Sequence, residues 1–479
     1  MMHSSNSRAN AFQTLVGIFL HSANTPQTVI DFLARCGVSI SSNTITTSLS
    51  NLSQGAETNM QRLGKTFLAA YAYDNLDIDF KQDVPVIERQ GDTLVHLTTG
   101  TMLPLHPKVA LADLNCSDEL WKKYYRNPSF KASDAPSIAI YDIHNIHPEQ
   151  QHPSGLTRRD RFNAWKFRSD LVNFGPEYFR KFLTKLGDPE PIDMIPCSQS
   201  SQVPLRTVDV SPSTPAGNAE ALDDFFRQSG IGDGGLGREK VNNRVVLVFG
   251  DLLTGQHVRS LLESLSEETT PWRRLQFVVF VMGLFHLKMA CADAIWRIFI
   301  QPKGSDIDSN ALMQYISQIR PKETGKFKLK PGFRRMHEII QHVGIVLRLD
   351  SWRIKASQQN ASYSSLEDFA KSSPDWDTIV KLSEEVTKNE GKLAADLDQL
   401  RGCNDAERDK QRENNLLLAQ YFLLYEEISY AMNHGDIGRV EDCFLPWMYI
   451  FMGCGKHKYA KEMRRYLENV HFHYPEGLR

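Results

Sequence analysis

The sequence predicts an α+β protein that is mostly helical, with a small mixed β-sheet at its core, N-terminal helices and a large helical insertion. Three observations support this fold class. Apolar residues recur at helical spacing over residues 11–53, two short apolar strands end in the aspartates Asp74 and Asp251, and helical spacing dominates residues 303–434. At 479 residues the chain is long for one compact core, so we expect several domains or one core with an insertion.

The composition is that of an ordinary globular protein. Hydrophobic residues make up 41% and charged residues 23%, which excludes wholesale disorder and collagen-like classes. The formal net charge of −2 means that a nucleic-acid surface must come from local clusters of Lys and Arg. The seven cysteines form no CxxC pair, which argues against a disulfide framework and a thiolate zinc site. We therefore expect a reducing, intracellular compartment.

We expect neither a signal peptide nor a membrane partner. The first ten residues are polar, and no basic flank is followed by a long apolar run. The longest apolar stretch, residues 277–287, is too short to span a bilayer.

The first predicted segment is an N-terminal helical region over residues 1–60. Pro26 opens its second helix, Gly37 ends that helix, and a third begins near Ser41. The size is compatible with a helix-turn-helix, but residues 43–52 contain no Lys or Arg. We interpret the region as a helical packing unit rather than a DNA reader.

The second predicted segment, residues 61–302, contains the core sheet. An apolar and aromatic run ends at Asp74, and period-two alternation follows it. We predict a hairpin formed by residues 84–88 and 93–98. A strand over 244–250 ends at Asp251 and is expected to lie beside a strand over 69–74, and residues 275–282 suit a further strand. The Ser/Pro/Gly-rich residues 198–237 predict a long exposed loop.

Helical patterns account for most of the remaining chain. Residues 119–126 and 160–186 suit helices within the core segment. Residues 303–434 form the predicted helical insertion, and residues 435–479 contain two C-terminal helices that complete the core.

The strand-terminal acids Asp74 and Asp251 are the first candidates for chemistry. Carboxylates at the ends of neighbouring buried strands converge at one edge of a sheet, where their oxygens can hold Mg²⁺ or Mn²⁺. Two-metal phosphoryl transfer needs such a pair and usually a third acid from a later helix. The alternative is that each aspartate caps the turn or helix that follows it.

Later acids and histidines also have structural explanations. The motif GDIGRVED places Asp436, Glu441 and Asp442 at the start of a helix, where negative side chains complement the helix dipole. The histidines at 144, 147 and 152 have loose metal-like spacing, but the Pro and Gln residues between them favour an irregular loop over a zinc site. His286 lies among apolar residues, and we interpret it as a core histidine.

The run RPKETGKFKLKPGFRR places seven cations in sixteen residues against the single acid Glu323. Its glycine and proline residues predict an exposed connection, and Phe327 and Phe333 alternate with the charges, as on surfaces that track phosphates. A solvated loop is the alternative. The predicted nucleic-acid-binding residues are Lys322, Lys326, Lys328, Lys330, Arg334 and Arg335.

The chain resembles a known family through an ordered set of motifs: YAYDNLDIDF, HLTTGTMLPL, VVLVFGDLLTGQH, FHLKMACADAIW, the basic run with its continuation to LRLDSW, and GDIGRVEDCFLPWMYIFMGCGKHKYAKE. The family is a large fungal one, expanded in mushroom-forming basidiomycetes, catalogued as domain of unknown function 6589 and similar to transposases. The likeness spans residues 10 to 470. It implies a ribonuclease-H-like core with a helical insertion, as in DDE transposases. It also implies Asp74 as first acid, Asp251 as second and Glu441 as third, with Asp442 and Glu462 as alternatives.

The resemblance leaves two functions open. One is metal-dependent DNA strand transfer or nuclease activity, with Mg²⁺ or Mn²⁺ held by the three acids. The other is a catalytically inactive, domesticated nucleic-acid-binding or scaffold protein of the same fold. DNA is the expected partner and the nucleus the expected location, and a homo-oligomer stays open. No GxxxxGK[ST], GxSxG or HExxH motif occurs, which argues against an unrelated α/β enzyme.

Overall fold

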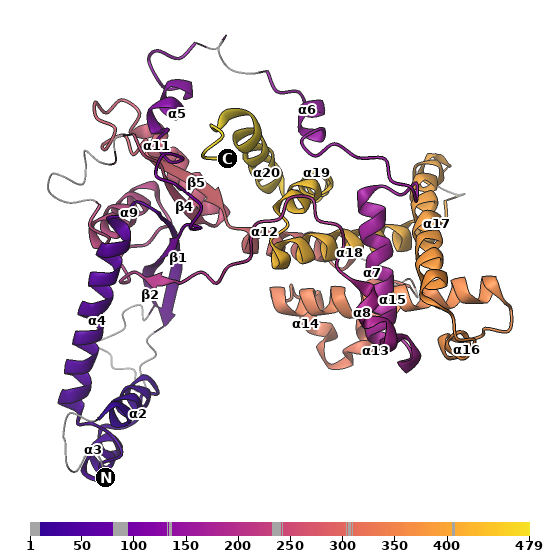
Figure 1. Cartoon of the computed structure of the whole chain (residues 1–479), viewed down its shortest axis with the longest axis horizontal. Helices are drawn as coiled ribbons and strands as arrows, with labels where there is room; N and C mark the ends of the chain where they lie inside the picture. The colour runs from indigo at the N-terminus through magenta and orange to yellow at the C-terminus, as the bar shows by residue number, and fades with distance from the viewer. Residues whose placement is uncertain are drawn as a thin grey trace. The chain divides into compact units, whose positions relative to one another are not determined.

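The computed structural model describes residues 10–79, 94–131, 133, 137–231, 241, 243–302, 304, 308, 310–404 and 408–479. The chain divides into two compact units, which Figure 1 draws with their helices and strands. Unit 1 comprises residues 1–134, 199–281 and 475–478, and unit 2 comprises residues 135–198, 282–474 and 479. The boundaries of the two units differ from those of the four predicted segments. The chain passes several times from one unit to the other, and the amino-acid composition does not change at these points.

Unit 1 is built on a mixed five-stranded sheet of order β3-β2-β1-β4-β5. Strand β1 (Ala69–Asp79) pairs antiparallel with β2 (Leu94–Pro104), which pairs antiparallel with the short β3 (Val203–Pro204). Strand β1 also pairs in parallel with β4 (Val246–Gly250), whose other neighbour is β5 (Val278–Met282). The predicted pairing of the strands over 69–74 and 244–250 is therefore confirmed.

Only one of the two strands of the predicted hairpin lies within the described residues. Its first strand, residues 84–88, lies outside the described residues. Residues 94–98 of the second strand pair with residues 75–79 of β1. The apolar run that ends at Asp74 and the alternating residues after it thus form one continuous strand.

Six helices of unit 1 accompany the sheet in the described part of the chain: α2 (Ala11–Ser22), α3 (Gln27–Arg35), α4 (Ser42–Gly64), α5 (Ser117–Lys123), α9 (Pro215–Gln228) and α11 (Leu252–Ser264). Ile30 of α3, Ile40 just before α4 and Ile45 of α4 form a small cluster, against which Leu20 of α2 packs. Ser41 caps α4, because its side chain accepts the Thr44 N–H.

Helix α9 corrects the prediction of an exposed loop over 198–237. Thr214 caps the helix and Pro215 occupies its first turn, where proline is favoured. Its apolar stripe is fully buried in the core against the Tyr71 ring. The proline and serine residues before the helix obscured this stripe, which consists of Ala221, Leu222, Phe225 and Phe226. Residues 232–237 lie outside the described part.

Unit 2 is helical. Its first elements are α6 (Ile140–His144), α7 (Arg158–Phe174), η3 (Glu177–Phe182), α8 (Leu183–Leu186) and α12 (Leu284–Phe299). They are followed by α13 (Leu312–Ile319), η4 (Pro321–Glu323), α14 (Thr324–Lys328), α15 (Phe333–Gln359), α16 (Leu366–Lys371), α17 (Trp376–Gly402) and α18 (Lys410–His434). The last are α19 (Ile437–Gly453), α20 (His457–Glu468) and the π-helix η5 (Asn469–His473).

Helices α7, α15 and α18 of unit 2 enclose opposite charges. Arg348 is 4% exposed, and its guanidinium donates to the carboxylates of Asp170 and Glu426. Lys166 contacts the same two carboxylates at 2.8 and 3.1 Å. Removing one partner from such a buried set leaves a charge without compensation, which is strongly destabilising.

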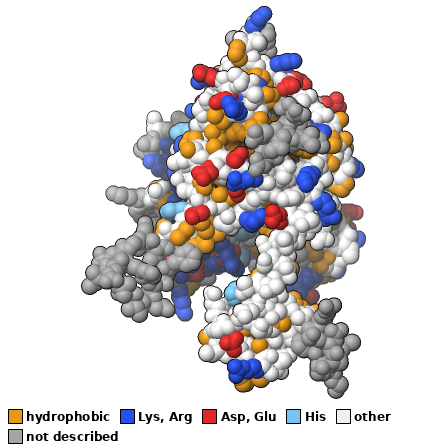
Figure 2. Space-filling view, turned by 90° about the vertical axis from the view of Figure 1, so that its left-hand side faces the viewer, with side chains coloured by type: hydrophobic (Ala, Val, Ile, Leu, Met, Phe, Trp, Pro, Cys, Tyr) orange, Lys and Arg blue, Asp and Glu red, His pale blue; other side chains and the backbone are white. Residues whose placement is uncertain are grey.

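The chain is thus an α+β protein, mostly helical, with a small mixed sheet, as predicted. On the face drawn in Figure 2, acidic and basic side chains are interspersed, in keeping with the net charge of −2. Within the described residues, no helix has both the length and the apolar character needed to cross a membrane.

Candidate functional site

The parallel pairing of β1 and β4 sets the first two predicted acids beside each other where β4 ends. Asp74 is not strand-terminal as predicted, because β1 continues to Asp79 in its pairing with β2. Tyr71 lies opposite Val248, and continuing this register by three residues sets Asp74 opposite Asp251. Residues in register on neighbouring strands point to the same face of a sheet. Tyr71 and Val248 are both buried in the main core. The two aspartates, three residues further along, therefore share the opposite face.

Both aspartates also have local structural contacts. Asp251 caps α11, because its Oδ1 accepts the backbone N–H of Thr254 at 2.7 Å. The Oδ1 of Asp74, which is exposed, accepts the backbone N–H of Asn75 at 2.8 Å. The capping role considered as an alternative therefore applies to Asp251.

The charge of Asp251 reaches the neighbouring strand. Burial and, to a smaller extent, the negative charge of Asp251 raise the pKa of Tyr73 well above its usual value. This effect agrees with the register, which places Asp251 at the end of β4 beside β1.

Glu441, the predicted third acid, lies in unit 2 on α19. Asp436 caps this helix, because its Oδ1 accepts the backbone N–H of Arg439 at 3.1 Å. The same oxygen accepts the N–H groups of Ile192 and Asp193 at 3.2 and 3.0 Å. These bonds fix the start of α19, and Glu441 lies in the next turn with only 5% of the residue exposed.

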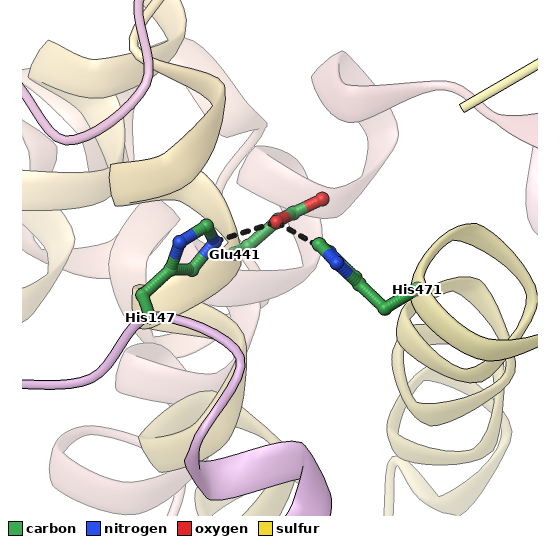
Figure 3. A group of neighbouring side chains, drawn as sticks. All are labelled: His147, Glu441 and His471. Atoms are coloured by element: carbon green, nitrogen blue, oxygen red, sulfur yellow. Dashed lines mark hydrogen bonds and ion pairs between the residues drawn. The ribbon is translucent and has the colours of Figure 1, made fainter. Parts of the chain in front are cut away.

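Two histidines enclose the Glu441 carboxylate, as Figure 3 shows. The Oε2 atom lies 2.7 Å from Nε2 of His147 and 2.8 Å from Nε2 of His471. Ligand-capable atoms of the three residues all lie within 4.8 Å of one another. His147 follows α6, and His471 lies in η5. Three distant parts of the sequence thus meet in this group, which we call the His–Glu–His cluster.

The cluster holds Glu441 in its ionised form. Burial disfavours the carboxylate, but the hydrogen bonds with His147 and His471 outweigh burial, so the pKa of Glu441 lies below its usual value. Burial and then the charge of Glu441 raise the pKa of Tyr466. A cavity of about 10 Å³, roughly the room of one water molecule, adjoins the cluster. It is lined by Ile143, His144, Ile146, His147, Glu441, Asp442, Leu445 and Leu467.

The alternative third acids and the other two spaced histidines have different partners. Asp442 pairs with Arg159 at 3.2 Å, and Glu462 pairs with Arg465 at 3.4 Å. His144 Nε2 lies 3.4 Å from the Tyr449 hydroxyl. His152 Nδ1 lies 2.8 Å from the hydroxyl of Ser154. The three spaced histidines therefore do not meet, and only His147 of them joins the cluster.

Sequence reasoning missed His471. Glu441 and His147 were both considered, but in separate roles, because no spacing pattern links positions 147, 441 and 471. The motif HFH near the C-terminus was the only local sign.

The basic run lies in unit 2 across η4, α14 and the start of α15. Its arginines are paired with acids: Glu338 with Arg320 at 2.6 Å and with Arg334 at 2.9 Å, and Glu323 with Arg335 at 3.7 Å. The lysines of the run are all exposed, namely Lys322, Lys326, Lys328 and Lys330.

The aromatics of the run are not open stacking surfaces. Phe327 is fully buried, and its carbonyl accepts the indole N–H of Trp296 at 2.7 Å. Phe333 is half-buried and packs edge-on against Phe285. A cavity of about 330 Å³ lies beside the run and is lined in part by His286, Lys330, Phe333 and Lys456. His286 is half-buried there rather than enclosed in the core.

Comparison with known proteins identifies one family. A family model described as a family of unknown function (DUF6589) matches residues 134–479. No curated protein and no solved structure matches the chain.

Proposed function

Since the chain belongs to this family of unknown function, we propose its function from the geometry of unit 1. We propose a transposase-derived protein that acts on DNA strands and holds a divalent metal ion, Mg²⁺ or Mn²⁺, between Asp74 and Asp251. The observation that carries the proposal is the β1–β4 register, which sets these two acids opposite each other on one face of the sheet.

The strand order supports a ribonuclease-H-like core. In unit 1, β2 is antiparallel to both neighbours, β1 is parallel to β4, and the order is β3-β2-β1-β4-β5. This is the strand order of ribonuclease-H-like sheets, the class that the sequence motifs imply. The helices that follow β5 agree with a core that carries a large helical addition.

The donor set fits a hard divalent cation. Carboxylate oxygens are the ligands that Mg²⁺ and Mn²⁺ prefer, and Mg²⁺ sites in proteins commonly use one or two carboxylates with water. A bound ion of this kind lowers the pKa of a water nucleophile and stabilises a leaving oxygen. Asp74 and Asp251 would hold the ion where β4 ends beside β1. Glu441 as the third acid stays a prediction.

DNA would be held through its phosphates rather than its bases. Four exposed lysines within nine residues of the basic run form a local positive patch on a chain of near-zero net charge. Lysine contacts of this kind bind DNA independently of base sequence.

The test is cleavage of supercoiled DNA with Mg²⁺ or Mn²⁺ by the full chain and by Asp74→Asn and Asp251→Asn. Asparagine caps helices about as well as aspartate, so Asp251→Asn should keep α11 intact. We expect each variant to lose at least about 100-fold in cleavage rate, since even second-shell changes at metal sites cost about 10–100-fold. Asp79→Asn, at the far end of β1, is the matched control and should retain the wild-type rate.

A second function is favoured by the capping bond of Asp251, which gives this acid a purely structural use. In that case the chain is a catalytically inactive, domesticated nucleic-acid-binding or scaffold protein. DNA binding without metal-dependent cleavage in the wild-type protein would support this second function and exclude the first.

A further inference from the structure

We propose that the His–Glu–His cluster of unit 2 is a binding site for a divalent transition metal of the zinc class. Its ligands are Nε2 of His147, Nε2 of His471 and a carboxylate oxygen of Glu441. All three ligands lie in unit 2, and the proposal does not depend on the function proposed above.

The donor set matches the chemistry of zinc. Two imidazole nitrogens and one carboxylate are a recurrent ligand set for zinc, whereas Mg²⁺ prefers oxygen ligands only. Ligands at about 2.0–2.1 Å from a tetrahedral zinc ion lie roughly 3.3 Å apart. The two N–O separations in the cluster are 2.7 and 2.8 Å. Each histidine therefore needs to move outward by only about half an ångström to admit the ion.

The ligands are held by structure rather than by flexible surface groups. The side chains of Glu441, His471 and His147 are 5%, 8% and 17% exposed. Glu441 is ionised, as a metal-binding carboxylate must be. The capping bonds of Asp436 fix the helix that carries it. Little ordering is then needed when an ion binds.

The π-helix at the C-terminal ligand is a second, independent observation. His471 lies within η5, and π-helical turns are rare and occur frequently at functional sites. The wider turn changes the direction of the side chains that follow α20, and His471 is the side chain that reaches Glu441.

A small cavity adjoins two of the three ligands, His147 and Glu441, and could hold a water molecule as a fourth ligand. The adjoining cavity of about 10 Å³ has room for roughly one water molecule and is lined by His144 and Asp442 as well as His147 and Glu441. Three protein ligands with one open position are the arrangement of catalytic rather than structural zinc sites.

The alternative is a hydrogen-bonded clamp in which both histidines donate to Glu441 and bind no ion. A clamp and a metal site use the same side chains but respond differently to added metal. Histidine can carry its ring proton on Nδ1 and present the Nε2 lone pair to an ion, so a metal site gains stability from Zn²⁺. A clamp gains none.

The experiment is a Zn²⁺ titration of the chelator-treated full chain against a chromophoric competitor, with the melting temperature recorded in parallel. We expect the wild-type chain to bind one Zn²⁺ ion at the cluster. The bound ion should raise the melting temperature of the protein. His147→Ala, His471→Ala and Glu441→Gln should each lower the Zn²⁺ affinity at least about 100-fold. Co²⁺ in place of Zn²⁺ should give visible absorption bands that the same variants lose.

His96→Ala is the matched control, because His96 also contacts a carboxylate, at 2.6 Å from Asp77, but in unit 1. It should bind Zn²⁺ as the wild type does. His147→Asn keeps a hydrogen-bond donor beside Glu441 and so tests binding if an alanine variant fails to fold. Equal Zn²⁺ binding by the wild type and by the folded His147 variants would overturn the proposal, as would an unchanged melting temperature in the wild type.

Discussion

The basic run offers the sharpest test of DNA contact. The perturbation is the triple change Lys326→Glu, Lys328→Glu and Lys330→Glu. These lysines are exposed, whereas the arginines of the run already face Glu338 and Glu323. The arginines are therefore partly neutralised, and the exposed position of the lysines lets their ammonium groups contact phosphates.

The expected loss of DNA affinity follows from counterion release. Each phosphate contact contributes about 0.9 to the slope of log affinity against log salt, so three lost contacts lower the slope by up to about 2.7. Between 50 and 200 mM salt, each contact changes the affinity by about 3.5-fold, and three contacts change it by up to about 40-fold. The reversed charges should add repulsion at low salt.

The assay is binding of the full chain to several unrelated duplexes across a salt series. A uniform loss on all duplexes and a shallower slope are expected. The matched control is Lys371→Glu, Lys381→Glu and Lys388→Glu, which makes the same charge change at exposed positions of α16 and α17. Unchanged affinity and slope in the first variant, or equal losses in the control, would refute the reasoning.

Two further predictions concern charges in unit 2. Asp170→Asn should destabilise the protein by about 3–5 kcal/mol, because it leaves buried Arg348 short of a partner, and urea unfolding will measure the change. A loss below about 1 kcal/mol would contradict it. Hydrogen bonds from Arg334 and Arg320 hold the pKa of Glu338 at about 2. The ionised Glu338 carboxylate thus stabilises the protein above pH 4.5, and this effect is lost as the pH falls toward 2. The free energies of unfolding of the wild type and of Glu338→Gln should therefore converge over that range. A constant difference would contradict this assignment.

The apolar parts of β1 and β4 were predictable because each is a short apolar run followed by an aspartate, although β1 continues beyond Asp74 to Asp79. The residues before Asp74 and Asp251 are buried on both faces or nearly so, and such strands are recognisable without any partner. That the two strands lie side by side was predictable for the same reason, whereas their parallel direction is given by the structure.

Helix α9 was not predictable in the same way. Its stripe of four apolar residues is short, and the preceding Ser, Pro and Gly residues are typical of loops. The segment forms a buried helix because it packs against β1. Phe226 packs edge-on with Tyr71, and the Tyr73 hydroxyl donates to Asn218. Tertiary contacts of this kind leave no periodic signal in the segment itself.

The His–Glu–His cluster could not be found from the sequence because its members come from a loop, a helix and a π-helix. Metal motifs are recognised when ligands share one element at fixed spacing. Here Glu441 and His147 are separated by 294 positions, and His471 follows Glu441 by 30. The position of Glu441 itself depends on contacts distant in the sequence, because Asp436 fixes the start of α19 through the N–H groups of residues 192 and 193.

The three candidates for the third acid differ in what their present partners permit. Asp442 and Glu462 face Arg159 and Arg465, and arginine stays charged at every accessible pH. A cation entering there would meet a fixed positive charge. Glu441 faces two histidines, whose imidazole nitrogens are common ligands of metal ions. Glu441 is therefore the candidate best suited to bind metal, but the nitrogen donors beside it favour an ion of the zinc class over Mg²⁺.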